Sequence, residues 1–323
     1  MELNELSQKW ALLASSGNKN INSIRLDSNA LPNLFIGINQ NLNRCLILQL
    51  PLDYKADFQT SVKQNLSLEL FEDTRWVVMS LLDEQYIDLF DDLIYSIYNK
   101  IKDMNLPSDY MSEFLKTYYK WSEFFQENNG NTLSDESVRG LFGELVFLHN
   151  ILEESDSILL NDVLNSWKGP YDTGHDFVGE FKNIEVKTKT DLSSGIRISS
   201  EYQLQCEIGK ELELVIVIVK TDSSGFSLRD LINLIRELVI VRLGDYTILL
   251  KAISQKGLTL KNISNYEHLR YIPQELIGYS CDSNDFPKLI THNIPDAIDS
   301  LSYRIKVHLI EHYITYKKTL QWK

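Results

Sequence analysis

A short segment in the middle of the chain carries the residue types of a phosphodiester-cleaving site. In Asn183-Ile-Glu-Val-Lys-Thr-Lys189 the polar and apolar residues alternate, so a strand would place Glu185 and Lys187 on one face and Ile184 and Val186 on the other. Asp176 lies upstream in His175-Asp-Phe-Val-Gly-Glu-Phe181, which also has the character of a strand. With Lys182-Asn183 as the turn, a hairpin would bring the two carboxylates together.

Two carboxylates that converge on one point repel each other unless a cation lies between them. Mg²⁺ is a hard cation that one or two carboxylates, phosphate oxygens and water hold well. An ammonium group such as that of Lys187 would orient or help to deprotonate the attacking water and would stabilise negative charge at phosphorus. The alternative is a solvated strand face with alternating charges, because the Glu-x-Lys tripeptide is common by itself.

A third acidic residue stands in an apolar helical segment, Arg139-Gly-Leu-Phe-Gly-Glu-Leu-Val-Phe-Leu148. Carboxylates such as Glu144 seldom remain unpaired among so many apolar neighbours. Gly140 and Gly143 are poor helix formers, and their missing side chains would allow the helix to lie close against a sheet. Glu144 is therefore expected to be a third acidic ligand or a partner of Lys187, and the alternative is a snorkelling or capped acid.

These motifs, in this order, resemble the PD-(D/E)XK nuclease superfamily. More narrowly, they resemble the bacterial group of PD-(D/E)XK-motif proteins found in phage-defence gene neighbourhoods. The resemblance covers about residues 135 to 250 and rests on five segments: Gly140-Leu-Phe-Gly-Glu144, Trp167-Lys-Gly-Pro170, His175-Asp176-Phe177, Glu185-Val-Lys187 and Ser199-Ser-Glu-Tyr-Gln-Leu204.

The resemblance implies roles for single residues. Asp176 and Glu185 would be metal ligands together with the Val186 carbonyl, and Lys187 would be the catalytic lysine. Glu144 would be the acidic residue of the first core helix and a further ligand, and the ion would be Mg²⁺, which Mn²⁺ would replace. Gln203 would match a polar position near the metal or the attacking water. His175 stands where the family has its named proline.

The same resemblance leaves the loop Trp167-Lys168 open. These residues would contact DNA, or Trp167 would be a loop aromatic that packs on the core, which is the commoner arrangement.

A second motif competes for a metal. His308-Leu-Ile-Glu-His312 matches the inverted zinc-protease pattern, in which two imidazoles lie one helical turn apart. Such a site needs a further acidic ligand downstream, and Tyr313 to Lys323 contains no Asp, Glu or His. We therefore expect this motif to be a solvated helix face.

Charge argues against DNA binding by a broad basic face. The 323 residues have a net charge of -13, and residues 131–260 alone have 13 Lys or Arg against 20 Asp or Glu. A protein that holds duplex DNA by itself usually neutralises several phosphates with basic side chains. We therefore expect other proteins of a defence system to supply part of the DNA affinity, and a homodimer is expected by analogy with cores that cut both strands.

Other sequence features indicate the compartment. The apolar stretches are shorter than the roughly 18 residues of a membrane helix, and the acidic start Met1 to Glu5 does not resemble a signal peptide. Cys45, Cys206 and Cys281 are isolated, which is typical of reduced thiols in the cytoplasm. We expect a cytoplasmic protein that contacts no membrane.

The fold is expected to be α/β, with a restriction-endonuclease-like core that has a mixed central sheet flanked by helices. Residues 1–130 would form an N-terminal α+β domain, 131–255 the core and 256–323 a C-terminal extension packed on it, with the first boundary at Asn128–Asn131. Strands are expected near 34–38, 44–50, 66–71 and 75–81, followed by helices over 84–102 and 110–126. In the core, helices are expected over 134–153, 227–241 and 246–253, with strands over 175–181, 183–188, 196–200 and 212–219.

The function expected from these features is Mg²⁺-dependent hydrolysis of DNA by an endonuclease, in a bacterial anti-phage defence or restriction system. The alternative is a non-catalytic adaptor or sensor that keeps the nuclease fold and binds protein partners.

Overall fold

The computed structural model describes residues 3–14, 21–56, 58, 60–126, 132–171, 174–295, 297–298 and 301–322. The chain forms two compact units, Met1–Asn128 and Asn129–Lys323. The boundary predicted at residues 128–131 lies outside the described residues.

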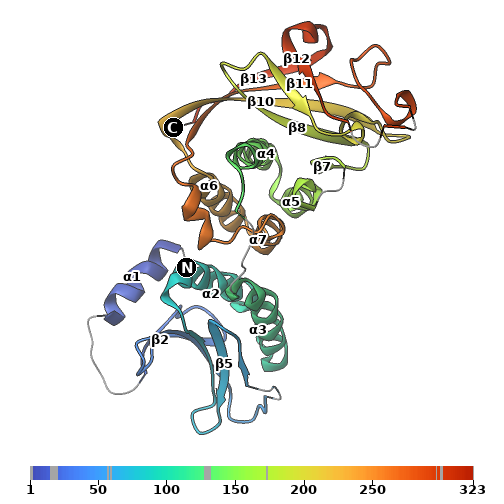
Figure 1. Cartoon of the computed structure of the whole chain (residues 1–323). Coiled ribbons are helices and arrows are strands. Elements are labelled where there is room, and N and C mark those ends of the chain that lie inside the picture. Colours follow the sequence, from blue (N-terminus) through green and yellow to red (C-terminus); the bar gives the residue numbers. More distant parts are fainter. Residues whose placement is uncertain are drawn as a thin grey trace. The chain divides into compact units, whose positions relative to one another are not determined.

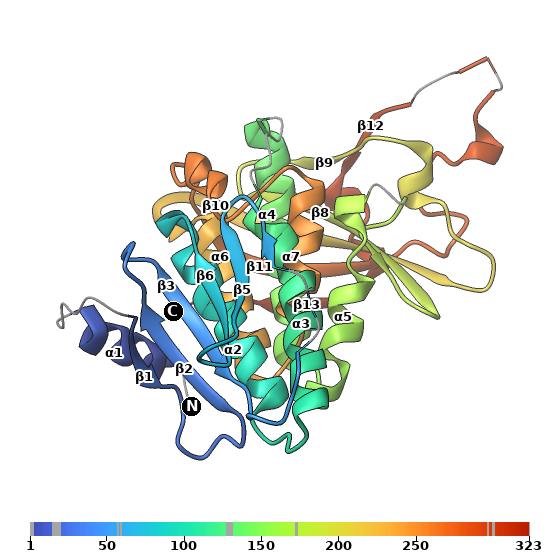
Figure 2. The ribbon, with the colours of Figure 1, turned by 90° about the horizontal axis from the view of Figure 1, so that it is seen from below.

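The first unit is a six-stranded antiparallel sheet with the order β1-β2-β3-β6-β5-β4. Figures 1 and 2 show helices α2 and α3 lying along one face of this sheet. The side chains of Leu34, Ile36, Leu46 and Leu48 are buried on one face of the sheet, because Leu34 pairs with Leu48 and Ile36 with Leu46 and side chains alternate between the faces along each strand. The elements of this unit are α1 (Leu3–Ala14), β1 (Asn22–Arg25), β2 (Asn33–Ile38), β3 (Arg44–Gln49), β4 (Ser61–Val62), β5 (Leu66–Phe71), β6 (Trp76–Leu81), α2 (Ile87–Ile101) and α3 (Pro107–Ser122).

The second unit is built on a mixed five-stranded sheet with the order β13-β11-β10-β8-β7. Strands β8 and β10 are parallel, and the other neighbours are antiparallel. The mixed sheet with flanking helices confirms the expected fold class. The strands are β7 (Phe177–Val178), β8 (Lys182–Thr190), β10 (Glu211–Phe226), β11 (Tyr271–Ser280) and β13 (Ile314–Thr319).

The two faces of this mixed sheet are covered differently. Helices α4 (Asp135–Glu154), α5 (Leu160–Ser166), α6 (Leu228–Val241) and α7 (Tyr246–Gln255) lie on one face (Figure 1). On the other face, a two-stranded ribbon of β9 (Gly195–Ile198) and β12 (Tyr303–Lys306) packs against buried β10 and β11 side chains such as Leu214 and Tyr279. The sheet is therefore the middle layer of three.

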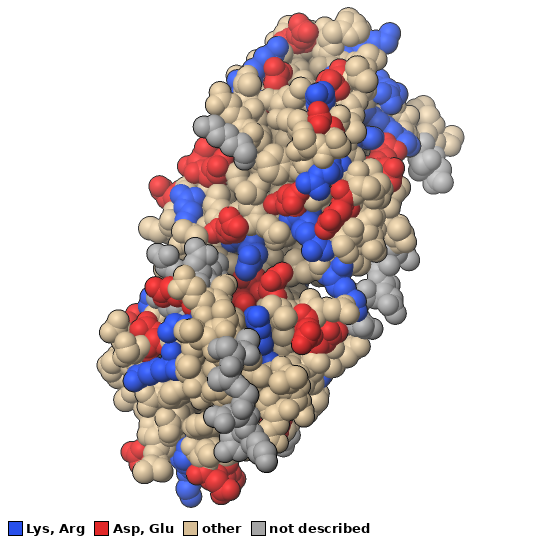
Figure 3. Space-filling view, turned by 90° about the vertical axis from the view of Figure 1, so that its left-hand side faces the viewer, with Lys and Arg blue, Asp and Glu red and all other residues tan. Residues whose placement is uncertain are grey.

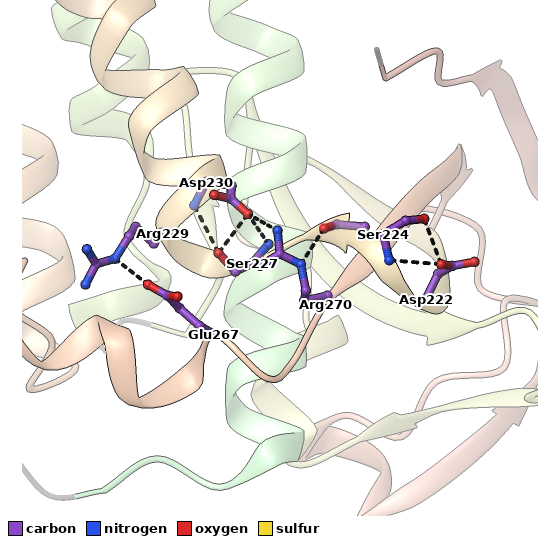
Figure 4. A network of polar contacts seen from close by, with 8 residues as sticks. Asp222, Ser224, Ser227, Arg229, Asp230, Glu267 and Arg270 are labelled. Carbon is purple, nitrogen blue, oxygen red and sulfur yellow. Dashed lines mark hydrogen bonds and ion pairs between the residues drawn. The ribbon is translucent and has the colours of Figure 1, made fainter.

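A polar network fixes the start of α6 to the end of β10 (Figure 4). Ser227 caps the helix by accepting the backbone N–H of Asp230, whose carboxylate in turn accepts the Ser227 N–H. Arg270, just before β11, donates to the Gly225 carbonyl and forms a 2.8 Å ion pair with Asp230. The guanidinium thus joins the segment before β11 to the β10–α6 junction, which lies about 40 residues earlier in the sequence.

The second unit differs from the sequence prediction in several details. The β7–β8 hairpin forms, but its turn lies between Gly179 and Lys182, which are joined by a 3.0 Å backbone hydrogen bond, and Asn183 is inside β8. A Cβ at position 179 would lie 2.7 Å from the Lys182 carbonyl oxygen, so glycine allows the tight turn. Residues 256–323 supply β11 and β13 to the central sheet and β12 to the ribbon, so they are more than a layer packed on the core.

The prediction of a helix at residues 308–312 is wrong. His308 and His312 lie in two short 3-10 turns, Val307–Leu309 and Glu311–Tyr313, and β13 follows directly. Both side chains are exposed. Within the described ranges, no group of three His, Cys, Asp or Glu side chains is arranged to hold a metal ion, at this motif or elsewhere.

Among the described residues, no helix is both long and apolar enough to cross a membrane. The three cysteines are free thiols, and two of them, Cys45 and Cys281, are buried.

Candidate active site

Helix α4 lies close to β8 at one glycine. It begins after its N-cap Ser134, at the start of the helix expected over 134–153, and a Cβ at Gly143 would lie only 1.9 Å from the hydroxyl of Thr188 on β8. Thr188 donates a 3.3 Å hydrogen bond to the Gly140 carbonyl. The prediction that a glycine lets the helix lie close against the sheet is therefore confirmed at Gly143. It is wrong at Gly140, where an added Cβ would meet no described atom within 4 Å.

Glu144 follows this contact on α4 and has a specific partner. Its Oε2 accepts a 2.8 Å hydrogen bond from the indole N–H of Trp167, whose side chain is 1% exposed. The indole thus satisfies one lone pair of a carboxylate that would otherwise be costly to bury. Because it is buried, Trp167 packs in the core and does not present its ring to a polymer, which decides between the two arrangements considered for it.

The Asp176 carboxylate accepts a β8 backbone N–H that lies beyond the pairing with β7. Strand β7 pairs with β8 only through Phe177 and Val178, so the next N–H along β8, that of Val186, needs another acceptor. The Asp176 carboxylate supplies it through Oδ2 at 2.7 Å. The hairpin thereby places the Asp176 carboxylate directly beside the Glu185–Lys187 segment, as the sequence predicts.

Glu185 and Lys187 form an ion pair on β8. The Lys187 ammonium lies 2.5 Å from Glu185 Oε1, and Glu185 is 1% exposed. The second carboxylate oxygen of Glu185, Oε2, is buried and accepts no hydrogen bond from any residue that the structure describes. A buried carboxylate oxygen without a partner is costly, and a cation nearby would relieve that cost.

Gly169 creates the space in which two carboxylates meet. A Cβ at this position would lie 2.2 Å from Glu144 Oε2 and 2.9 Å from Asp176 Oδ1. The backbone N–H groups of Lys168 and Gly169 both donate to the Asp176 carbonyl, at 2.7 and 2.9 Å, which fixes this loop against β7. The two acidic side chains therefore share a cradle that only glycine leaves open.

Gln203 lies in the 3-10 turn Glu201–Leu204 after β9. Its Oε1 accepts the backbone N–H of Ser199 at 2.7 Å, so the amide nitrogen is the group that remains to donate.

These groups line one cavity of about 420 Å³. Its wall includes Glu144, Asp176, Val186, Lys187 and Gln203, whereas Glu185 is not among the lining residues. The lining contains six basic residues against three acidic ones, although the chain as a whole is acidic. The basic residues are Arg139, Lys187, Lys189, Arg197, Lys256 and Arg304.

The acidic groups perturb each other's protonation. Burial, together with the charge of Asp176, raises the pKa of Glu144 to about 8. Burial and the same neighbour raise the pKa of Glu185 well above its ordinary value, and burial raises the pKa of Asp176. Burial alone would lower the pKa of Lys187, but the carboxylates of Glu185 and Asp176 outweigh it and raise this pKa. Lys187 is thus held as an ammonium, which favours charge stabilisation over proton abstraction.

The donor set fits a divalent cation held by two carboxylates rather than by three. Glu144 and Asp176 meet at the Gly169 cradle with Asp176 Oδ1 directed there, whereas Glu185 is engaged with Lys187. Hard carboxylate oxygens in this number, completed by water and phosphate, are what Mg²⁺ normally uses.

Several residues at the site are not predicted as site residues from the sequence. Gly169 could have been suspected from the Trp-Lys-Gly-Pro segment, but nothing local shows that it faces two carboxylates. Lys256 lowers the pKa of both Glu144 and Asp176, although it follows α7 far along the chain. Arg197 and Arg304 reach the cavity from β9 and β12, and their pairing is not encoded by any short pattern.

The neighbours of the predicted site have structural roles. Lys168 lies with its ammonium 5.7 Å from the centre of the Tyr171 ring. The His175 side chain is buried beside Asn183, with its Nδ1 3.8 Å from Glu207 Oε1.

A mixed sheet flanked by helices, with Asp176 directly before β7, Glu185-x-Lys187 on the adjacent strand β8 and Glu144 on the preceding helix, defines a core of the PD-(D/E)XK class. The chain belongs to the family described as "Putative PD-(D/E)XK family member, (DUF4420)", whose model matches residues 6–308. Comparisons with curated proteins and with solved structures find no match. Enzymes of the PD-(D/E)XK superfamily generally use divalent metal ions.

Proposed function

We propose that this protein is a Mg²⁺-dependent endonuclease that hydrolyses DNA phosphodiester bonds and serves in a bacterial anti-phage defence or restriction system. The observation that carries the proposal is the cavity in which Glu144, Asp176 and Lys187 meet beneath a surplus of basic side chains. Acidic groups that attract a cation, beside basic groups that attract phosphate, are the two requirements of phosphodiester hydrolysis. The nuclease-like fold of the family supports the same conclusion.

In this mechanism Glu144 and Asp176 would hold the divalent ion, with the Val186 carbonyl and Glu185 next to them. When bound, the ion supplies Lewis-acid stabilisation of charge on the phosphoryl oxygens. The Lys187 ammonium, which the ion pair with Glu185 orients, stabilises the same developing charge. Gln203 offers its amide N–H to an oxygen of the substrate or of the attacking water.

Plasmid cleavage tests this proposal. Purified protein should cut plasmid DNA with Mg²⁺ or Mn²⁺ and should be inactive in EDTA. Lys187→Ala should reduce the rate at least 100-fold, since loss of one preorganised charge costs about that much in comparable sites. Lys317→Ala, an exposed lysine on β13, is the matched control and should cut like the wild type. Full activity of Lys187→Ala with an unchanged circular dichroism spectrum would contradict the assignment.

A non-catalytic adaptor or sensor is the second candidate function. The Glu185–Lys187 ion pair favours it, because the two side chains neutralise each other before any substrate arrives. In that case neither Mg²⁺ nor Mn²⁺ would elicit cleavage of DNA or RNA by the wild type.

The negative net charge of the protein bears on how it would bind DNA. Figure 3 shows Lys and Arg interspersed with Asp and Glu on the face that it presents, with no extended basic field there. Since the net charge is -13, we propose that other proteins of the defence system, or a second copy of this chain, add to the DNA affinity. Tight binding of the isolated protein to random-sequence duplex at moderate salt, in a mobility-shift assay, would refute the need for partners.

A further inference from the structure

The ribbon of β9 and β12 has two chemically different faces. Ile196 and Ile198 of β9 and Ile305 of β12 are buried in the core on one face. The other face carries Arg197 and Arg304, which are directly opposite in the antiparallel register, and exposed Lys306 two pairs further along. One face of this ribbon is therefore fixed to the protein, and the other is basic.

Two like charges directly opposite each other destabilise a strand pair unless an anion lies between them. Neither Arg197 nor Arg304 forms an ion pair with a carboxylate in the part of the chain that the structure describes. Each is instead held by a neutral acceptor: Arg197 Nε donates to the Ser302 hydroxyl at 3.0 Å, and Arg304 Nη2 donates to the Gly195 carbonyl at 3.1 Å. These bonds orient the guanidinium groups, and most of their other N–H donors have no acceptor among the described residues.

The position of this pair indicates its ligand. Arg197, Arg304 and Lys189 line the same cavity as Glu144 and Asp176. A free phosphate ion would need only one anion site, whereas a polymer that places one phosphate at the carboxylates must place its next phosphates along the wall. The ribbon is the basic part of that wall, and guanidinium groups match phosphate oxygens with paired hydrogen bonds.

We propose that Arg197 and Arg304 form a phosphate clamp that binds the DNA backbone beside the phosphate that is cleaved. This proposal rests on the proposed nuclease function and adds a substrate-binding role for β12, which comes from the last 25 residues of the chain. Side chains between residues 144 and 187 would carry out the hydrolysis, and the β9–β12 ribbon would hold the DNA strand in position.

The test is the salt dependence of DNA binding by Arg197→Gln, Arg304→Gln and the double variant, with a labelled duplex, fluorescence anisotropy and EDTA to prevent cleavage. The matched control is Lys251→Gln with Lys317→Gln, two exposed lysines outside the cavity lining that give the same charge change. Each arginine substitution should weaken binding roughly 10-fold and lower the slope of log affinity against log salt by about one. The control should change neither by a comparable amount.

A kinetic readout separates a clamp from a merely structural ribbon. In cleavage assays the arginine variants should show a raised KM and a kcat within about threefold of the wild type. Arg304→Lys should restore only part of the affinity, because it keeps the charge and loses the planar fork. Thermal melting should show a cooperative transition for every variant, which establishes that each one is folded.

The outcomes are distinguishable from failure of the nuclease proposal. If the wild type binds DNA with the expected arginine dependence but never cleaves it, the clamp stands and the proposed function fails. If cleavage occurs but the double variant keeps the wild-type affinity and salt slope, the clamp is overturned. The same measurement with RNA checks the polymer: arginine-dependent binding to RNA without binding to DNA would overturn the DNA assignment.

Discussion

The indole N–H of Trp167 donates a 2.8 Å hydrogen bond to Oε2 of Glu144, joining a buried aromatic ring to the acidic side chain of the first core helix. This bond lowers the pKa of Glu144, against the effect of burial. Trp167 is therefore a positioning residue that favours the ionised carboxylate a metal requires.

Replacing this indole tests that role. Trp167→Phe keeps an aromatic ring but leaves Glu144 Oε2 without its donor, so divalent metal affinity should fall roughly 10-fold and stability by about 1–3 kcal/mol. Calorimetric titration with Mn²⁺ and urea unfolding measure the two effects. Trp76→Phe in the first unit is the control and should leave Mn²⁺ affinity unchanged; an equal loss in both variants would contradict the role of the bond.

Gly169 and Gly140 form a matched pair of glycines at the cavity. Gly169→Ala would place a Cβ 2.2 Å from Glu144 Oε2 and 2.9 Å from Asp176 Oδ1, so the carboxylates must separate and Mn²⁺ binding should be lost. Gly140→Ala meets no atom within 4 Å and adds helix propensity, so it should bind Mn²⁺ normally and be more stable by about 0.5–1 kcal/mol. Calorimetry and thermal melting of the two variants test this. Wild-type Mn²⁺ affinity in Gly169→Ala would show that the two carboxylates do not share one ion.

The stability of the metal-free protein should decrease as pH rises from about 6 to 8. Glu144 has a pKa of about 8 in the folded protein against an ordinary value of 4.5, so in this range the unfolded chain has released a proton that the folded one keeps. The free energy of unfolding therefore falls with pH, by about 1–2 kcal/mol from this group. Unfolding in EDTA at pH 6 and pH 8 measures the change, and Glu144→Gln should reduce it.

Added Mg²⁺ should reverse this trend, because metal and protons compete for the same carboxylates. The stabilisation by Mg²⁺ should be larger at pH 8 than at pH 6. Equal stabilisation at both pH values would indicate that the ion binds elsewhere.

The parts of the fold that the sequence predicts are those with local causes. The alternation over Asn183–Lys189, the caps at Ser134 and Ser227 and the apolar period of α6 each depend on neighbours within a few residues. They place Glu144, Glu185 and Lys187 on the correct elements. The Asp176 hairpin also follows from local pattern, although the tight turn at Gly179 does not coincide with the polar pair Lys182-Asn183.

The remaining parts depend on partners that are distant in the sequence. Strand β11 pairs with β10, and β12 pairs with β9 across more than 100 residues, which no periodicity specifies. The pairing of Arg197 with Arg304 is a consequence of that register. Glu185 was also expected as a direct ligand, whereas its ion pair with Lys187 depends on rotamers that spacing cannot determine; its role as a ligand stays a prediction.

The contact between Gly143 and Thr188 determines how closely α4 approaches the site, and a double-mutant cycle can measure it. Gly143→Ala would place a Cβ 1.9 Å from the Thr188 hydroxyl, so despite better helix propensity it should destabilise the protein by about 1–3 kcal/mol. Thr188→Ala removes that hydroxyl at the cost of its 3.3 Å bond to the Gly140 carbonyl. If the collision is the cause, the double variant should recover at least 0.5 kcal/mol relative to the sum of the single effects in urea unfolding. Strict additivity would show that α4 adjusts elsewhere, and Glu144 should then keep its Mn²⁺ affinity in Gly143→Ala.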